Sequence, residues 1–134
     1  MTKTKTNTLP PRLKSKQRIE QLFNGKDSKA ASIFPLRAIY RRYSSNDTGD
    51  ASQQLLFSVS KRHFKRAVKR NRAKRQMREA FRLNKSIIAG QPMDIAFVWL
   101  ADNLYDSERV HKAMVRLLDK ISHSAPSDNT TTGQ

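Results

Sequence analysis

Residues 58–82 read SVSKRHFKRAVKRNRAKRQMREAFR, and this stretch is the most informative part of the chain. Between Lys61 and Arg82 it holds eleven of the chain's 27 lysines and arginines, against one acid, Glu79. Like charges at this density repel one another and do not stabilise a fold by themselves. A bound polyanion would neutralise this repulsion, and nucleic acid is the commonest polyanion of this size.

The same stretch predicts an amphipathic helix from about residue 66 to residue 84. At 100° per residue, one stripe is apolar and faces a core; it consists of Ala73, Met77, Ala80 and Phe81. The opposite side is polar and basic, with Asn71, Arg75, Arg78 and Arg82 in line and Arg72 and Lys74 beside them. A solvated structural helix would interleave Glu with Lys at a spacing of four residues. The segregation of charge therefore favours a binding face.

The start of this helix is basic as well, which is unusual. Positive charge near a helix N-terminus opposes the macrodipole by roughly 0.3–1 kcal/mol per exposed charge, and bound phosphate would reverse that effect. The basic residues there are Lys61, Arg62, Lys65, Arg66, Lys69 and Arg70. Across 61–82, arginines outnumber lysines by seven to four. Because arginine forms bidentate contacts with phosphate and stacks on bases, this favours folded RNA or DNA.

The composition of the whole chain agrees with a nucleic-acid-binding protein. With 134 residues and a net charge of +16, we expect one domain over residues 15–121, a flexible basic segment over 1–14 and a disordered tail over 122–134. The sequence contains neither an apolar run of 18 residues nor a lipidation signal, so it gives no indication of a membrane protein. It also contains no cysteine, which excludes disulfides. Because MTKTKTNTLPPR at the start lacks an apolar segment, we expect a cytoplasmic protein.

The rest of the chain alternates between helical and extended patterns. Ser15 is a candidate N-cap for a short helix with Ile19, Leu22 and Phe23 along one edge and Gly25 at its end. Residues 34–43 and 55–60 alternate between apolar and polar, and the polar loop 44–53 predicts that they form a hairpin. In the first of these strands, one face would carry Phe34, Leu36, Ala38 and Tyr40.

Two further elements complete the predicted α/β sandwich. Residues 93–101, MDIAFVWLA, predict a strand covered on both faces. Asp106 or Ser107 then caps a final helix with a regular apolar set: Val110, Ala113, Met114, Leu117, Leu118 and Ile121.

The motifs in the basic stretch resemble a known family. The chain supplies Ser58-Val59-Ser60-Lys61, then Arg70-Asn71-Arg72, Lys74-Arg75 and Arg78-Glu79-Ala80-Phe81-Arg82. Together they resemble the signature of the bacterial ribonuclease P protein subunit. The resemblance extends in element order over about residues 9–121, and the motif 58–82 carries its specificity.

The resemblance implies a fold and a function. The implied fold is αβββαβα, related to a ribosomal-protein domain, with a left-handed crossover into the last strand and a short additional strand near 29–32. The implied function is that of the small basic partner of a catalytic RNA, with one protein per RNA. The two together remove the 5′ leader of precursor tRNA, and the RNA performs the hydrolysis with bound Mg²⁺.

The resemblance also implies roles for individual residues. The element that meets the catalytic RNA, with its phosphate contacts, corresponds to Lys61, Arg62, Lys65, Arg66, Lys69, Arg70, Asn71, Arg72, Lys74, Arg75, Arg78 and Arg82. A second surface, a cleft between the first helix and the sheet, would hold the single-stranded leader. Phe23 matches an aromatic position of that cleft, and Ala38 and Tyr40 match its floor. Ile19 replaces a second aromatic residue that many members have there.

No catalytic site and no metal site are expected in the protein itself. A metal nuclease needs clustered carboxylates, and the acids of this chain are dispersed. Asp94 is expected to end its strand or to pair with a basic neighbour. General acid–base cleavage of RNA would need cooperating histidines, but His63, His111 and His123 fall in three separate elements.

Two alternatives to a ribonuclease P subunit remain open at the level of sequence. A structural RNA-binding protein of ribosomal type would share the fold and the charge, and the ordered motif 58–82 argues against it. An architectural DNA-binding protein is disfavoured because the chain has neither a helix-turn-helix pair nor dimerising heptads.

Overall fold

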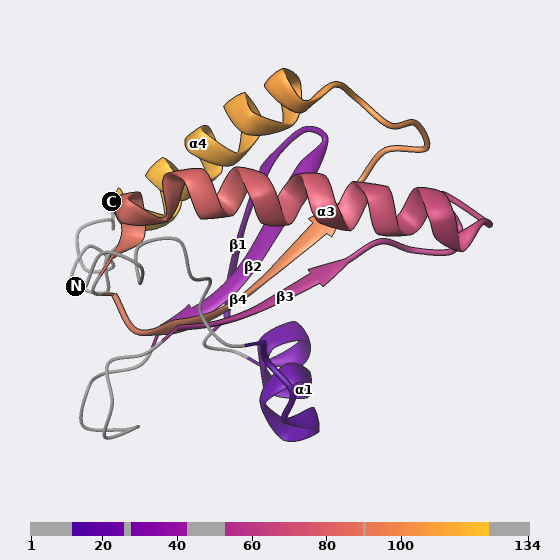
Figure 1. Cartoon of the computed structure of the whole chain (residues 1–134). Coiled ribbons are helices and arrows are strands. Elements are labelled where there is room, and N and C mark those ends of the chain that lie inside the picture. Colours follow the sequence, from indigo (N-terminus) through magenta and orange to yellow (C-terminus); the bar gives the residue numbers. More distant parts are fainter. Residues whose placement is uncertain (1–11, 26–27, 43–52, 90, 124–134) are drawn as a thin grey trace, which may run out of the picture.

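The fold is a mixed four-stranded sheet with helices on both faces (Figure 1). The computed structural model describes residues 12–25, 28–42, 53–89 and 91–123. In chain order the elements are α1 (Lys16–Asn24), β1 (Lys29–Ile33), β2 (Leu36–Arg42), β3 (Gln53–Ser58), α3 (Ala67–Asn84), the 3₁₀-helix η2 (Lys85–Ile88), β4 (Met93–Trp99) and α4 (Ser107–His123). The predicted α/β class and the order αβββαβα are confirmed.

The main core lies between the sheet and the helices α3 and α4. Alternate residues of each strand point to this side. The ring of Phe97 on β4 packs against those of Phe57 and Phe81, at centroid distances of 5.5 and 5.7 Å. The buried residues of α3 are the four predicted from its period, and the six predicted for α4 are also its buried set. Both helices are therefore fixed in rotation by their apolar stripes.

A smaller core lies on the opposite face of the sheet, under α1. It consists of Leu13, Leu22 and Ala96, with Ile19, Ile39 and Leu56 packed against them. Ser15 caps α1 as predicted, because its side chain accepts a hydrogen bond from the backbone N–H of Arg18. The strand β4 is thus covered on both faces, as its largely apolar sequence predicted.

The domain extends beyond both predicted boundaries. Leu13 is buried, and its N–H donates to the carbonyl of Leu55 over 2.8 Å, so the folded part begins before residue 15. At the other end α4 continues to His123, past the predicted end at residue 121. Most of the predicted flexible segment and tail, residues 1–11 and 124–134, lies outside the described residues.

The predicted hairpin between residues 34–43 and 55–60 is wrong. The sheet order is β1-β2-β4-β3, so β4 lies between these two strands and pairs antiparallel with β2 and parallel with β3. A parallel pair requires a long crossover, and α3 with η2 provides it. The true hairpin joins β1 and β2, with Phe34 and Pro35 in the turn, so Phe34 does not belong to the strand.

A buried ion pair holds α1 against the sheet. Asp94 on β4 is fully buried, and both its carboxylate oxygens accept from Arg18, from Nη2 over 2.8 Å and from Nε over 3.1 Å. The predicted pairing of Asp94 with a basic residue is confirmed. A bidentate contact of this kind fixes orientation as well as distance, so it sets the position of α1 on β4.

Candidate nucleic-acid interface

The loop between β3 and α3 is held by contacts within itself, with the main core and with the loop after β4. The carbonyl of Ser60 accepts from the N–H groups of His63 and Phe64 over 3.1 and 3.3 Å, and the Phe64 side chain is buried in the main core. His63 Nδ1 lies 2.6 Å from a carboxylate oxygen of Asp102, in the loop after β4. With the loop anchored in this way, Lys61, Arg62, Lys65 and Arg66 are left exposed.

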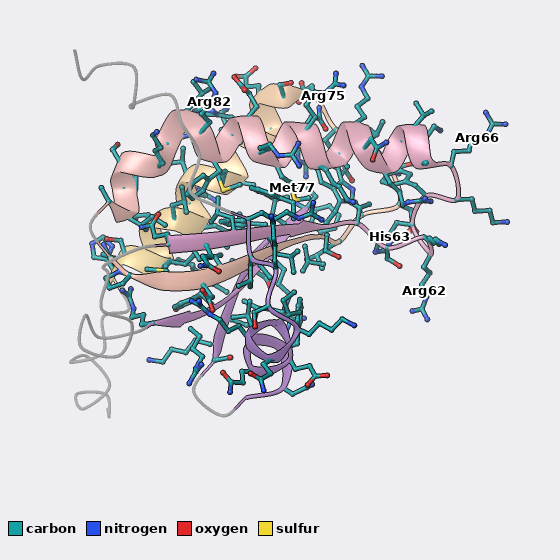
Figure 2. All side chains as sticks on the ribbon, turned by 60° about the horizontal axis from the view of Figure 1, so that its bottom comes forward. Arg62, His63, Arg66, Arg75, Met77 and Arg82 are labelled. Atoms are coloured by element: carbon teal, nitrogen blue, oxygen red, sulfur yellow. The ribbon has the colours of Figure 1, made fainter. Side chains whose placement is uncertain are left out.

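The polar side of α3 continues this basic surface along the helix. Figure 2 shows Met77 between α3 and the sheet, whereas Arg75 and Arg82 project from the other side of the helix. Of the twelve residues predicted to bind RNA, none is buried, and only Arg70, Lys74 and Arg82 are partly covered. The structure therefore leaves all twelve at least partly exposed, on α3 and on the loop before it.

The start of α3 lacks the usual stabilising groups. Arg66 at the N-cap makes no capping hydrogen bond with its side chain, and the first turn contains no acidic residue. Arg70 bends back instead, and its Nη1 donates to the carbonyls of Phe64 and Lys65 over 2.9 and 2.8 Å. Arg70 thus stabilises the loop, and the uncapped N–H groups beside it suit an anion.

Few of the predicted RNA-binding side chains contact other side chains within the described part of the chain. Arg82 pairs with Glu79 over 2.5 Å, and Arg78 lies 5.5 Å from the ring centre of Phe57. The hydrogen bond that Arg82 donates lowers the pKa of Glu79 below its ordinary value, so the pair is present at neutral pH and lost only on acidification. Among the described residues, Arg82 is the only one of the twelve paired with a carboxylate.

A small concavity beside α3 adds a residue that sequence reasoning missed. It has a volume of about 280 Å³ and lies between the β3 residues Leu55–Phe57 and the polar side of α3. Its lining side chains include Arg12, Asn71, Lys74 and Arg78, and no carboxylate. Arg12 reaches this place because residue 12 forms an isolated bridge with Leu55. Arg12 could not be identified from a local sequence motif, because its position depends on this long-range pairing with Leu55.

The predicted floor of the leader cleft is wrong. Ala38 and Tyr40 are buried in the main core under α3 and α4, on the face of the sheet that α1 does not cover. The residue of β2 that packs under α1 is Ile39, and Arg41 on the same face donates to Oε1 of Gln21 over 2.8 Å. Phe23 on α1 is 42% exposed, so it remains available for a contact, unlike Leu22 beside it.

The described residues hold neither a metal-binding cluster nor a membrane-spanning helix. No three His, Asp or Glu side chains come together in the described ranges. Asp94 and Glu79 are each engaged by an arginine. No helix of the described part is long and apolar enough to cross a membrane.

Comparisons with known proteins all lead to one family. The family model described as Ribonuclease P matches residues 10–122. A curated relative, the ribonuclease P protein component of Porphyromonas gingivalis, is 40% identical over 107 residues, which cover 75% of this chain and 77% of that protein.

Solved structures share the fold. The ribonuclease P protein from Thermotoga maritima has a TM-score of 0.66 at 24% identity, over 81% of this chain and 96% of that one. A mutant of the Staphylococcus aureus ribonuclease P protein, described as defective in mRNA degradation activity, has a TM-score of 0.66 at 23% identity, over 84% of this chain and 87% of that one.

Proposed function

The chain belongs to the ribonuclease P protein family, and from that premise we propose that it binds the catalytic RNA through α3 and the loop before it. Membership makes it a protein component of an endoribonuclease that acts in tRNA processing. We assign the RNA contacts to the surface formed by Lys61–Arg82, with Arg12 at its edge. One protein per RNA is the simplest arrangement, and the cytoplasm, where tRNA precursors are processed, is its expected location.

The observation that carries this proposal is the unneutralised charge on one side of α3. Arg72 and Arg75 are exposed and have no side-chain partner in the described part of the chain. A row of uncompensated arginines is unfavourable in the free protein, and phosphates bound by bidentate contacts remove the repulsion. The uncapped start of the helix favours the same kind of ligand.

We assign the single-stranded leader of precursor tRNA to the other side of the sheet, beside α1. Phe23 is the exposed aromatic side chain there, and a base stacked on such a ring contributes about 1–3 kcal/mol. Arg37, Ile39 and Arg41 share one face of β2 and replace Ala38 and Tyr40 as the sheet side of this surface. The contact of Arg41 with Gln21 connects the two sides of this surface.

We assign the hydrolysis, and the Mg²⁺ that supports it, to the catalytic RNA. The carboxylates in the described ranges are dispersed, and Asp94, the one that is buried, is held by Arg18, so these side chains do not fit a divalent metal. The role of this chain is then to position the RNA and the substrate and to reduce the repulsion between their phosphates.

The test is reconstitution with a cognate catalytic RNA at low Mg²⁺. We expect the protein to accelerate cleavage of precursor tRNA and a double Arg72→Glu, Arg75→Glu variant to lose most of that effect. A Lys120→Glu variant serves as the control, because Lys120 is exposed near the end of α4, outside both the surface proposed here and the groove beside α4. The proposal fails if the wild-type protein gives no acceleration, or if the α3 variant and the control behave alike.

A further inference from the structure

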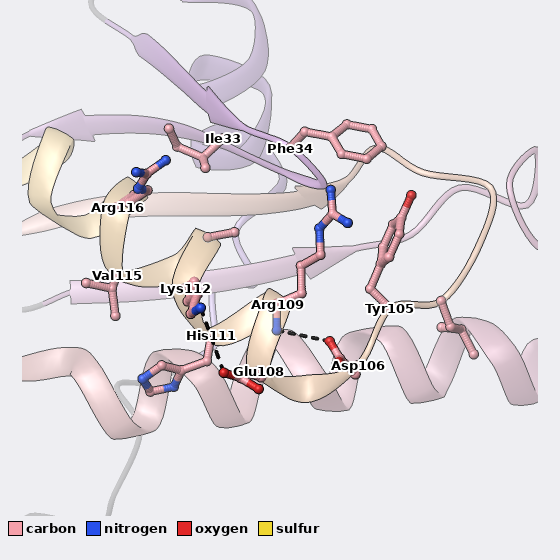
Figure 3. A pocket seen from close by; sticks show the side chains of 12 residues that line it. Ile33, Phe34, Tyr105, Asp106, Glu108, Arg109, His111, Lys112, Val115 and Arg116 are labelled. Carbon is pink, nitrogen blue, oxygen red and sulfur yellow. Dashed lines mark hydrogen bonds and ion pairs between the residues drawn. The ribbon is translucent and has the colours of Figure 1, made fainter.

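A second groove lies at the far edge of the sheet, away from the proposed RNA surface. It has a volume of about 1100 Å³ and runs between the β1–β2 turn and the exposed side of α4. In Figure 3, Phe34 and Tyr105 lie at one end with Arg109 reaching between them, and Arg116 lies at the other end beside Ile33. None of these residues belongs to the basic stretch 61–82 or to α1.

The aromatic end of the groove is fixed in place by the fold. The Tyr105 carbonyl accepts from Nε2 of Gln76 on α3 over 2.8 Å, and its ring packs against Trp99, with centroids 6.4 Å apart. Phe34 meets Tyr105 edge to face at 5.9 Å, and the guanidinium of Arg109 lies over the Tyr105 ring at 4.6 Å. Phe34 is nevertheless 52% exposed, so its ring is held in position but not covered.

The wall formed by α4 carries a row of cations. Arg109, Lys112 and Arg116 follow one another at spacings of three and four residues, so they lie along one side of the helix. Their Cα positions extend over about 10 Å, the length of about three stacked nucleotides.

Two acids also line the groove, and both are engaged. Asp106 caps α4 by accepting from the N–H of Arg109 over 3.2 Å, and Glu108 lies 3.8 Å from Lys112. Arg109 and Arg116 are left without a carboxylate partner among the described residues.

We propose that this groove binds a single-stranded segment of RNA, with a base stacked on Phe34 beside the Tyr105–Arg109 pair and phosphates along Lys112 and Arg116. The exposed ring of Phe34 next to a planar guanidinium suits the face of a nucleotide base, and cations in a row suit a backbone that carries one charge per nucleotide. A chain with a net charge of +16 favours such a ligand over a neutral one. A polyglutamate peptide could pair with the cations, but it has no planar or apolar group to pack on the rings.

The test is photocrosslinking of the full-length protein to a twelve-residue oligouridine that carries 4-thiouridine, with the adducts mapped by mass spectrometry. We expect adducts on the peptides that contain Phe34 or Tyr105. Their yield at a subsaturating RNA concentration should fall at least about fivefold in Phe34→Ala and in Arg109→Ala, and Phe34→Trp should restore it. Phe34 is exposed enough that its removal should leave the melting temperature unchanged, which checks the fold.

The same experiment separates this groove from the surfaces proposed above. Phe23→Ala should leave the groove adducts unchanged, and no catalytic RNA is present, so failure of the proposed function would not alter the result. The inference is overturned if adducts form only elsewhere, if Phe34→Trp behaves like Phe34→Ala, or if a polyglutamate peptide displaces the oligouridine from the groove while an unlabelled oligouridine does not.

Discussion

Replacing Arg75 by Gln should flatten the salt dependence of binding to the catalytic RNA. Arg75 is exposed and unpaired in the described part of the chain, so its guanidinium can engage a phosphate without breaking an internal contact. One lost phosphate contact reduces the slope of log K against log salt by about 0.9. Between 50 and 200 mM salt, the variant should therefore lose about 3.5-fold less affinity than the wild type.

The neighbouring pair of Arg82 and Glu79 provides matched comparisons. Because Arg82 is already paired over 2.5 Å, Arg82→Gln should change the slope by less than Arg75→Gln does. Glu79→Gln removes the carboxylate partner of Arg82 and should steepen the slope, by at most about one unit. Lys120→Gln, near the end of α4 and outside the residues that line the groove beside that helix, should leave the slope unchanged.

The assay is a filter-binding or fluorescence titration of each variant at four or more salt concentrations. The decisive quantity is the slope, because a variant that is merely less folded loses affinity at all salt concentrations alike. If Arg75→Gln keeps the wild-type slope, the outer face of α3 does not contact phosphate and the reasoning is refuted.

Three other predictions concern α1 and the start of the domain. Phe23→Ala should weaken binding of leader-bearing precursor at least about fivefold while mature tRNA binds as before; equal losses for both would instead indicate a structural role. Arg18→Ala should lower the free energy of unfolding by about 3 kcal/mol in urea titrations, because it removes the bidentate partner of the buried carboxylate of Asp94, and the double replacement of Arg18 and Asp94 by Leu should recover most of that loss. Leu13→Ala should cost about 2–4 kcal/mol by the same measurement, whereas a negligible cost would mean that the domain begins later.

The helices could be predicted from the sequence because each has a single apolar stripe. Met77 and Phe81 on α3, and Leu117 and Leu118 on α4, are buried as their spacing requires. The basic surface followed from the same periodicity, since a helix that buries one side must expose the other.

The strand order could not be predicted, because local patterns do not identify a strand's partner. Residues 34–43 and 55–60 are consecutive strand segments in the sequence, but β4 lies between them in the sheet. The largely apolar sequence of β4 predicted only a strand covered on both faces, not its neighbours. The groove beside α4 escaped prediction for a similar reason, since it joins residues 33–34 to residues 104–116.

The wrong assignment of Ala38 and Tyr40 to the cleft could have been avoided from the sequence. Both faces of β2 are covered by helices, so alternation alone does not say which face lies toward α1. The charged residues could have shown which face lies toward α1. Arg37 and Arg41 share a face with Ile39, and the face that carries arginines cannot be the one in the main core. The resemblance to the family assigned the floor of the cleft to the residues of β2 that face the opposite side of the sheet.

The most direct test of the central claim is a crosslinking footprint of the catalytic RNA on the protein, read by mass spectrometry under conditions in which the complex cleaves precursor tRNA. We predict that peptides from residues 61–82 carry RNA adducts and that Arg72→Glu with Arg75→Glu removes them together with the acceleration of cleavage. An active complex whose adducts lie wholly outside residues 61–82 would contradict the account.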